Sequence, residues 1–184
     1  MSEHSNSNET KFNPLLISLH WLMALLIIVV YVTMEFHEVF PKGSNERLLM
    51  KSLHFMLGLT VLFLVFIRLV LRFSTAVPPI VPAPKPIEVM LAKLMHLALY
   101  GFMIAMPILG WLILSSHGKP IPFFGFELPP LMGENEDIGD IVHELHEVGA
   151  SLGYLLLGGH SLAGLFHHYI KKDNTLFRMS FLRK

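Results

Sequence analysis

The segment Pro14–Phe36, PLLISLHWLMALLIIVVYVTMEF, decides the fold. A helix needs about 20 mostly apolar residues to cross a bilayer, and this segment is long enough. Pro14 suits the first turn of such a helix, where a missing backbone N–H is tolerated. Glu3 and Glu9 stand where a removable signal peptide would be basic. We therefore expect this span to stay in the membrane as an anchor.

Three further apolar segments meet the same length criterion, at residues 48–71, 87–114 and 142–170. The composition agrees, because the chain is 53% hydrophobic and 15% charged, whereas about a quarter of the residues in a soluble domain are charged. A proline-rich link precedes the third span, and an acidic loop with Glu134, Glu136, Asp137 and Asp140 precedes the fourth. We predict one domain over residues 1–184, an all-α integral membrane four-helix bundle.

Charge and cysteine content exclude several classes of function. The 14 basic and 14 acidic residues balance, so nothing indicates a nucleic-acid partner. The chain has no cysteine, which excludes disulfides, thiolate zinc sites, iron–sulfur clusters and c-type haem attachment. It has 11 histidines, and their positions carry the functional information.

The distribution of Lys and Arg predicts the orientation, because these residues favour the cytoplasmic side. With the N-terminus inside, four basic residues lie outside: Lys42, Arg47, Lys51 and Lys119. Ten lie inside: Lys11, Arg68, Arg72, Lys85, Lys93, Lys171, Lys172, Arg178, Arg183 and Lys184. We therefore expect both termini in the cytoplasm and an inner-membrane, multi-pass location.

Four histidines within the spans fall into two pairs at matched depths. His20 and His160 lie in the inner half of the membrane, and His54 and His146 lie in the outer half. Ionisable side chains inside membrane helices are rare, which makes each a functional candidate. His146 and His160 are 14 residues apart, so they face the same way and lie about 21 Å apart along a helix. Opposed imidazoles are the natural axial ligands of haem iron, so we predict two haem b groups, one in each leaflet.

Other polar residues are candidates for further contacts with the haems, for alternative ligands or for a quinone site. Arg68 follows His54 by 14 residues and lies on the same stripe at the inner level, where it could pair with a haem propionate. His96 could replace His20 or His160, whereas His143 points about 100° away from His160. At the inner surface, His167 and His168 are either an interfacial polar cap or candidates for binding a quinone headgroup.

Several motifs resemble those of prokaryotic cytochrome b561 from about Phe12 to Met179. They are Ser18-Leu19-His20-Trp21, Met34-Glu35-Phe36, Pro78-Pro79-Ile80-Val81-Pro82, His146-Glu147, Phe166-His167-His168-Tyr169 and Lys172-Asp173-Asn174-Thr175-Leu176. The resemblance implies a di-haem inner-membrane protein with axial ligands at His20, His54, His146 and His160. It also implies superoxide oxidase activity, in which electrons pass from superoxide at the outer, periplasmic side to ubiquinone.

Two alternatives remain at the level of sequence. In the first, the chain is a haem-bearing membrane anchor that passes electrons from a partner dehydrogenase or hydrogenase to quinone. In the second, the histidines belong to a metal-ion transporter. A transporter path would need carboxylates inside the spans, and Glu35 is the only acidic residue well placed for it.

Overall fold

The computed structural model describes residues 11–181, in which four long helices dominate. They are α1 (Pro14–Phe36), α2 (Asn45–Ser74), α3 (Pro86–Ser116) and α4 (Glu136–Phe166). All four are long and apolar enough to cross a membrane, which confirms the prediction of an all-α membrane bundle. The expectations that rest on Glu3, Glu9, Arg183 and Lys184 lie outside the described residues.

Polar side chains fix the helix starts. Asn13 accepts a hydrogen bond from the Leu15 N–H at 2.9 Å, Ser44 accepts one from Arg47, and Asn135 accepts one from Ile138. Each cap satisfies a backbone donor that has no partner within its helix. Because polar caps and not hydropathy set these boundaries, α2 and α4 begin before the predicted spans.

The region between α3 and α4 differs from the predicted acidic loop. Glu136, Asp137 and Asp140 lie in the first turns of α4, where negative charge is favoured by the helix dipole. The residues before them form a short antiparallel hairpin of β1 (Ile121–Phe123) and β2 (Phe126–Leu128). Ile121 is buried against α2 and α3, so the hairpin closes this end of the bundle.

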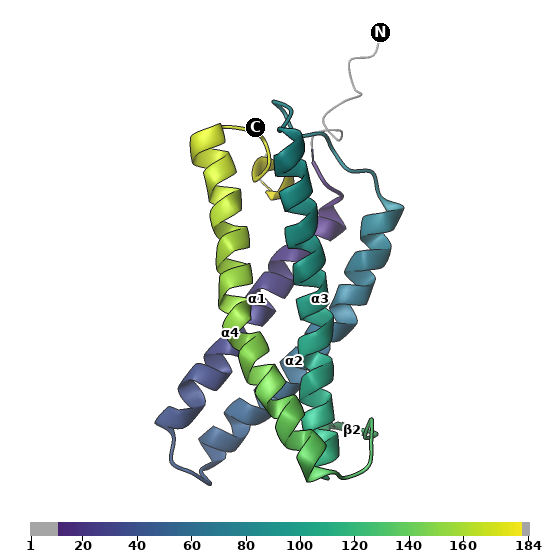
Figure 1. Cartoon of the computed structure of the whole chain (residues 1–184), viewed down its shortest axis with the longest axis vertical. Helices are drawn as coiled ribbons and strands as arrows, with labels where there is room; N and C mark the ends of the chain where they lie inside the picture. The colour runs from purple at the N-terminus through teal and green to yellow at the C-terminus, as the bar shows by residue number, and fades with distance from the viewer. Residues whose placement is uncertain (1–10, 182–184) are drawn as a thin grey trace.

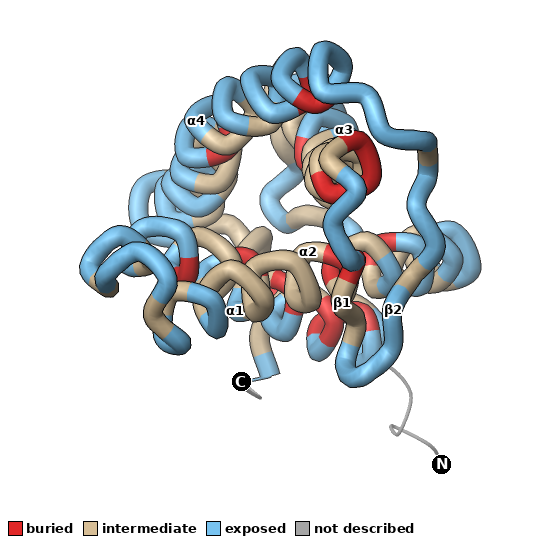
Figure 2. The backbone as a smooth tube through the Cα atoms, turned by 90° about the horizontal axis from the view of Figure 1, so that it is seen from below, coloured by how far each residue is buried: buried red, intermediate tan, exposed pale blue. Residues whose placement is uncertain are grey.

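The helices form two layers. Viewed from below, α1 and α2 lie in one layer, and α3 and α4 lie across from them (Figure 2). Contacts run from α1 to α2, from α2 to α3 and from α3 to α4. Both ends of the described chain lie at the top (Figure 1), where the Phe12 N–H donates to the Arg178 carbonyl at 3.1 Å. The two ends therefore share one side, and its assignment to the cytoplasm stays a prediction.

The outer surface of the bundle is apolar. In the most apolar stretch of each membrane-spanning helix, no more than 28% of the residues are buried. Many large apolar side chains, such as Phe63 and Leu155, are exposed. A water-soluble protein of this size would bury such side chains. The exposure is that of helices surrounded by lipid.

The proline-rich link is joined to the C-terminal segment. Asn174 accepts a hydrogen bond from the Val81 N–H at 2.8 Å and donates one to the Pro79 carbonyl at 3.3 Å. Two motifs that lie far apart in the sequence thus meet beside the end of α4. The short η2 turn (His167–Lys171) continues α4 to this point.

Candidate functional site

The outer pair of histidines lies between α2 and α4. The ring centroids of His54 and His146 are 6.1 Å apart, with the ring planes at 70°. His54 Nδ1 lies 3.1 Å from the Val30 carbonyl of α1. Since a carbonyl can only accept, Nδ1 carries the proton, and the Nε2 lone pair is free for a metal.

The inner pair repeats this arrangement between α1 and α4. The ring centroids of His20 and His160 are 6.0 Å apart, again with the planes at 70°. Two imidazoles bound to opposite sides of one metal through bonds of about 2 Å place their centroids about 6 Å apart. Both pairs therefore have the spacing of an axial clamp. Because α4 is one continuous helix, the two clamps are about 21 Å apart along it.

Glycines leave room beside the ligand candidates. Gly58 and Gly164 each follow a histidine, His54 and His160 respectively, by one helical turn. A Cβ atom built at either glycine would meet no atom within 4 Å. Side chains one turn apart lie on the same helix face, so open space adjoins each ring. A flat macrocycle needs such space, and the residues present fit one.

His96 forms a third member of the inner group. Its ring centroid is 5.6 Å from that of His160, so the structure brings together all three candidates for the inner site. Its Nδ1 lies 2.6 Å from the Ala92 carbonyl in its own helix. The pairing of His20 with His160 matches the outer pair more closely in distance and ring angle, which favours it over a pairing with His96.

Arg68 lies at the inner pair, as its spacing predicted. Its Nη1 donates to the Leu16 carbonyl at 2.9 Å, and its Nη2 is 3.4 Å from His20 Nδ1. Within residues 11–181 no carboxylate is ion-paired with this guanidinium. A partly buried guanidinium within a membrane span is stabilised by an acidic partner, and a propionate beside His20 would supply one.

His143 lies outside the clamps. Its side chain is 56% exposed, and its Nε2 is 3.8 Å from Glu147 one turn along α4. Among the described residues, no group of three or more His, Asp or Glu side chains could hold a metal ion. Glu35, which the transporter alternative needed, is instead hydrogen-bonded to Tyr154.

His167 and His168, the two histidines predicted to lie at the inner surface, have different surroundings. His167 Nδ1 donates to Asp173 at 2.5 Å, and Lys171 forms an ion pair with Glu88 at the start of α3. A cavity of about 50 Å³ lies between these acidic groups and the proline-rich link. His168 is exposed and packs edge to face against Tyr169. Of the two, His167 is therefore the one within a polar cluster.

The carboxylate of Asp173 completes that cluster. Burial alone would raise its pKa, but hydrogen bonds from His167 and Thr175 more than offset this effect and hold the pKa of Asp173 below its usual value. Sequence reasoning had assigned Asp173 only to a motif. Its contact with His167 across the end of η2 depends on a tight turn, in which Lys172 has a φ of 56°.

Comparisons with known proteins identify the family. The model of prokaryotic cytochrome b561 matches residues 11–181. Cytochrome b561 homolog 1 of Escherichia coli K12 is 40% identical over 95% of this chain and 99% of its own. A protein of Yersinia pestis named "Probable superoxide oxidase CybB" is 37% identical over 92% and 95%. Cytochrome b561 homolog 2 of E. coli is 30% identical over 87% and 86%. The chain therefore belongs to the prokaryotic cytochrome b561 family: it is a multi-pass bacterial membrane electron carrier whose cofactor is haem b.

Proposed function

We propose that His54 and His146 bind one haem b in the outer leaflet, and that His20 and His160 bind a second in the inner leaflet. The observation that carries the proposal is the equal geometry of the two pairs, with ring centroids 6.1 and 6.0 Å apart. When bound, haem iron supplies a reversible one-electron change. The protein contributes ligation, burial and orientation.

Each ligand needs a lone pair at one ring nitrogen, and for His54 a backbone carbonyl leaves Nε2 with that lone pair. The Val30 carbonyl holds the proton of His54 on Nδ1, which orients that ring as partners around a metal site usually do. If His20 binds through Nε2, its Nδ1 carries the proton and can no longer accept from Arg68. The Arg68 guanidinium would then donate to an acidic acceptor, and we assign that role to a propionate of the inner haem.

We propose further that superoxide gives electrons at the outer side and that ubiquinone takes them up at the inner side. Two superoxide anions release two electrons and become two O₂ molecules. These electrons and two protons convert one ubiquinone to ubiquinol. If two imidazoles hold each haem iron, no ligand position would be left open, and the haem would supply electron exchange at its porphyrin edge and not at the metal. The name of the relative from Y. pestis supports this choice of donor.

Basic residues at the outer side would attract the superoxide anion. They are Lys42, Arg47, Lys51 and Lys119. At the inner side, His167 and Asp173 would deliver protons to the quinone, and His168 would contact it from the surface. The cavity there holds only about 50 Å³, so we propose that the ion pair of Glu88 and Lys171 opens when the ring enters.

The test uses purified, haem-loaded protein, a superoxide-generating system and a short-chain ubiquinone. Ubiquinol should form, and superoxide dismutase should abolish its formation. His54→Ala should suppress it, whereas His143→Ala, which alters an exposed histidine outside the clamps, should not. If superoxide fails to reduce ubiquinone but a membrane dehydrogenase or hydrogenase fraction reduces it through this protein, the chain is the membrane anchor of such a partner.

A further inference from the structure

The hairpin of β1 and β2 carries three phenylalanines around its turn, Phe123, Phe124 and Phe126. It lies at the end of the bundle opposite both termini (Figure 1), and its turn projects from the flank of the bundle (Figure 2). Ile121 at the base is 1% exposed, whereas Phe126 beside the turn is 77% exposed. The base is therefore packed on the helices, and the turn is an exposed apolar patch of the kind that marks an interaction site.

The two faces of the hairpin differ in polarity. Successive side chains of a strand point to opposite faces, so Phe126 shares a face with Leu128, and Glu127 lies on the other. Cross-strand partners also share a face, and Ile121 is the partner of Leu128. Phe123 is likewise the partner of Phe126. Ile121, Phe123 and Leu128 pack against α2 and α3. Phe126 extends the same apolar face beyond these helices.

The turn itself contains an unfavourable residue. Phe124 and Gly125 form a two-residue connection in which both have positive φ, 46° and 87°. Such a turn favours Asn or Asp before the glycine, and a positive φ is uncommon for a bulky side chain. The Phe124 side chain is moreover 56% exposed. An apolar ring at this position suits neither the turn nor water, but it suits lipid.

Contacts hold the turn against membrane-spanning helices. The Phe124 N–H donates to Met56 Sδ of α2 at 3.3 Å. Met56 lies five residues beyond Lys51, within a stretch that has no Lys, Arg, Asp or Glu before Arg68. On α3, the Trp111 indole donates to the Pro129 carbonyl at 3.0 Å, and tryptophan is enriched where membrane meets water. The hairpin is therefore placed beside the spans at a membrane boundary.

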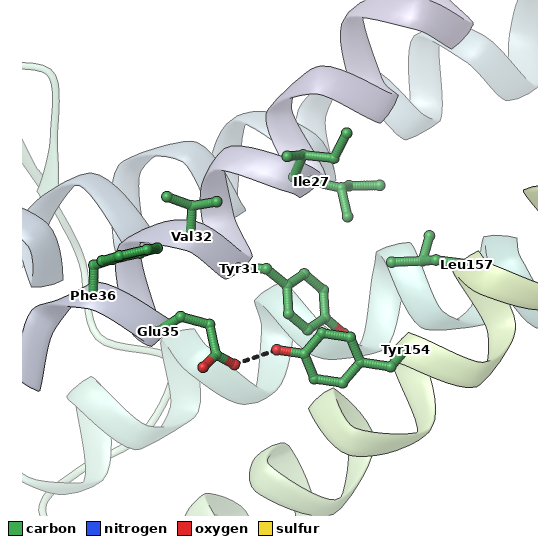
Figure 3. Close-up of a pocket in the computed structure, with 8 residues that line it drawn as sticks. Ile27, Tyr31, Val32, Glu35, Phe36, Tyr154 and Leu157 are labelled. Carbon is green, nitrogen blue, oxygen red and sulfur yellow. Dashed lines mark hydrogen bonds between the residues drawn. The ribbon is translucent and has the colours of Figure 1, made fainter.

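The apolar surface of the bundle continues to this end. On the other side of the bundle, Val32 and Phe36 in the last turns of α1 are about half exposed (Figure 3). On α2, Leu62 packs beside the hairpin, and the next residue, Phe63, is exposed. The phenylalanines of the turn thus adjoin a surface that already faces lipid, which identifies lipid as the partner of the patch.

We propose that the hairpin turn is a membrane anchor, in which Phe124 and Phe126 insert into the boundary between lipid headgroups and acyl chains. Aromatic and aliphatic side chains are the usual anchors at this depth. The anchor goes beyond the proposed function, since it assigns a lipid-binding role to an element outside the four helices. It does not depend on electron transfer or on either substrate.

The experiment measures the depth of nitroxide labels by electron paramagnetic resonance. The chain has no cysteine, so Phe124→Cys and Phe126→Cys can each carry a single label. The haem-loaded protein is placed in vesicles of phosphatidylethanolamine and phosphatidylglycerol. Power saturation then compares relaxation by oxygen, which concentrates in lipid, with relaxation by a water-soluble nickel complex. Both labels should respond more to oxygen and lie within about 10 Å of the headgroup boundary.

Two reference positions calibrate the measurement. A label at Phe63→Cys reports lipid, because Phe63 is 65% exposed within a span. A label at Glu134→Cys reports water, because Glu134 is exposed in the loop before α4. The haem spectrum of each labelled protein shows whether it has folded.

A further substitution separates anchoring from folding. Phe124→Asn suits the turn better than the native residue, so it should preserve the hairpin while removing one apolar ring. In this background the label at residue 126 should shift toward the aqueous reference. Glu127→Gln is the matched control, because it alters the opposite face of the same hairpin, and it should leave the depth of that label unchanged.

Each outcome decides the assignment. Stronger relaxation by nickel than by oxygen at both positions would place the turn in water and overturn the proposal. Protection from both reagents would mean that protein covers the patch, either a second copy or a partner, and would overturn lipid as the occupant. A label at residue 126 that stays at the same depth after Phe124→Asn would exclude Phe124 from the anchor.

Discussion

The imidazole rings of His54 and His146, which belong to different helices, lie edge to face with their centroids 6.1 Å apart and their planes at 70°. The rings of His20 and His160 repeat this relationship at the other end of α4. Two helix pairs, α2 with α4 and α1 with α4, arrive at one geometry, and its ring spacing is that of an axial clamp. Each pair of histidines can therefore be tested by variants of its own.

Replacing His54 with alanine should remove the outer haem and leave the inner one. The reason is that, of the other three candidate ligands, His54 contacts only His146, while the inner rings lie about 21 Å away along α4. A redox titration followed by optical absorption should then show one component where the wild type shows two. Retention of both components, or loss of the inner haem, would mean that the pairing is wrong.

The inner group permits a direct choice between ligands. His20→Ala should abolish the inner haem, whereas His96→Ala should retain it, because His20 and His160 have the geometry of the outer clamp. The haem content of the two variants decides the question. The reverse result would make His96 the partner of His160, a pairing that their ring separation of 5.6 Å also permits.

Hydropathy predicted four spans because each is long and nearly free of charge. It could not place the ends of α2 and α4, since polar turns extend a helix beyond its apolar part. The helix α4 begins at Glu136, where the sequence reads as an acidic loop. The hairpin of Ile121–Leu128 was missed for a related reason: its strands are three residues long and carry too little periodicity to detect.

The paired depths of the histidines also followed from sequence, because chain direction and residue number set the depth along a helix. Rotation and crossing angle do not follow from residue number. For that reason the contact of Glu35 with Tyr154 and the contact of His167 with Asp173 became visible only in the structure, whereas His96 was already a candidate for the inner site. Residues of these types are common at a membrane interface, so nothing in the sequence indicated these contacts.

The side chains of Tyr31 and Phe102 should fit against α4 only because residue 153 is a glycine. A Cβ atom at this position would lie 2.0 Å from the Tyr31 hydroxyl and 2.6 Å from the Phe102 ring. Gly153→Ala should therefore destabilise the protein by about 1–3 kcal/mol, as overpacking usually does. Gly101→Ala is the control, since nothing lies within 4 Å of the Cβ built there. Thermal unfolding followed by circular dichroism compares them, and equal midpoints would argue against the contact.

Removing the charge of Asp173 should destabilise the inner end in a pH-dependent manner. Its pKa is depressed in the folded protein, so its contribution is present above the unfolded-state value of about 3.9. That contribution is lost as the pH falls through the lower, folded value. Asp173→Asn should lower the unfolding midpoint at pH 7, and the difference from wild type should shrink below about pH 4. A difference that stays constant over this range would exclude ionisation as the cause.

The pyridine haemochrome of the purified protein, normalised to polypeptide, tests the central claim most directly. We predict two protohaems per chain in the wild type and one in each of His146→Ala and His160→Ala, with a different haem lost in each. A wild-type protein without protohaem, or two variants that both keep two haems, would contradict the assignment of these histidines.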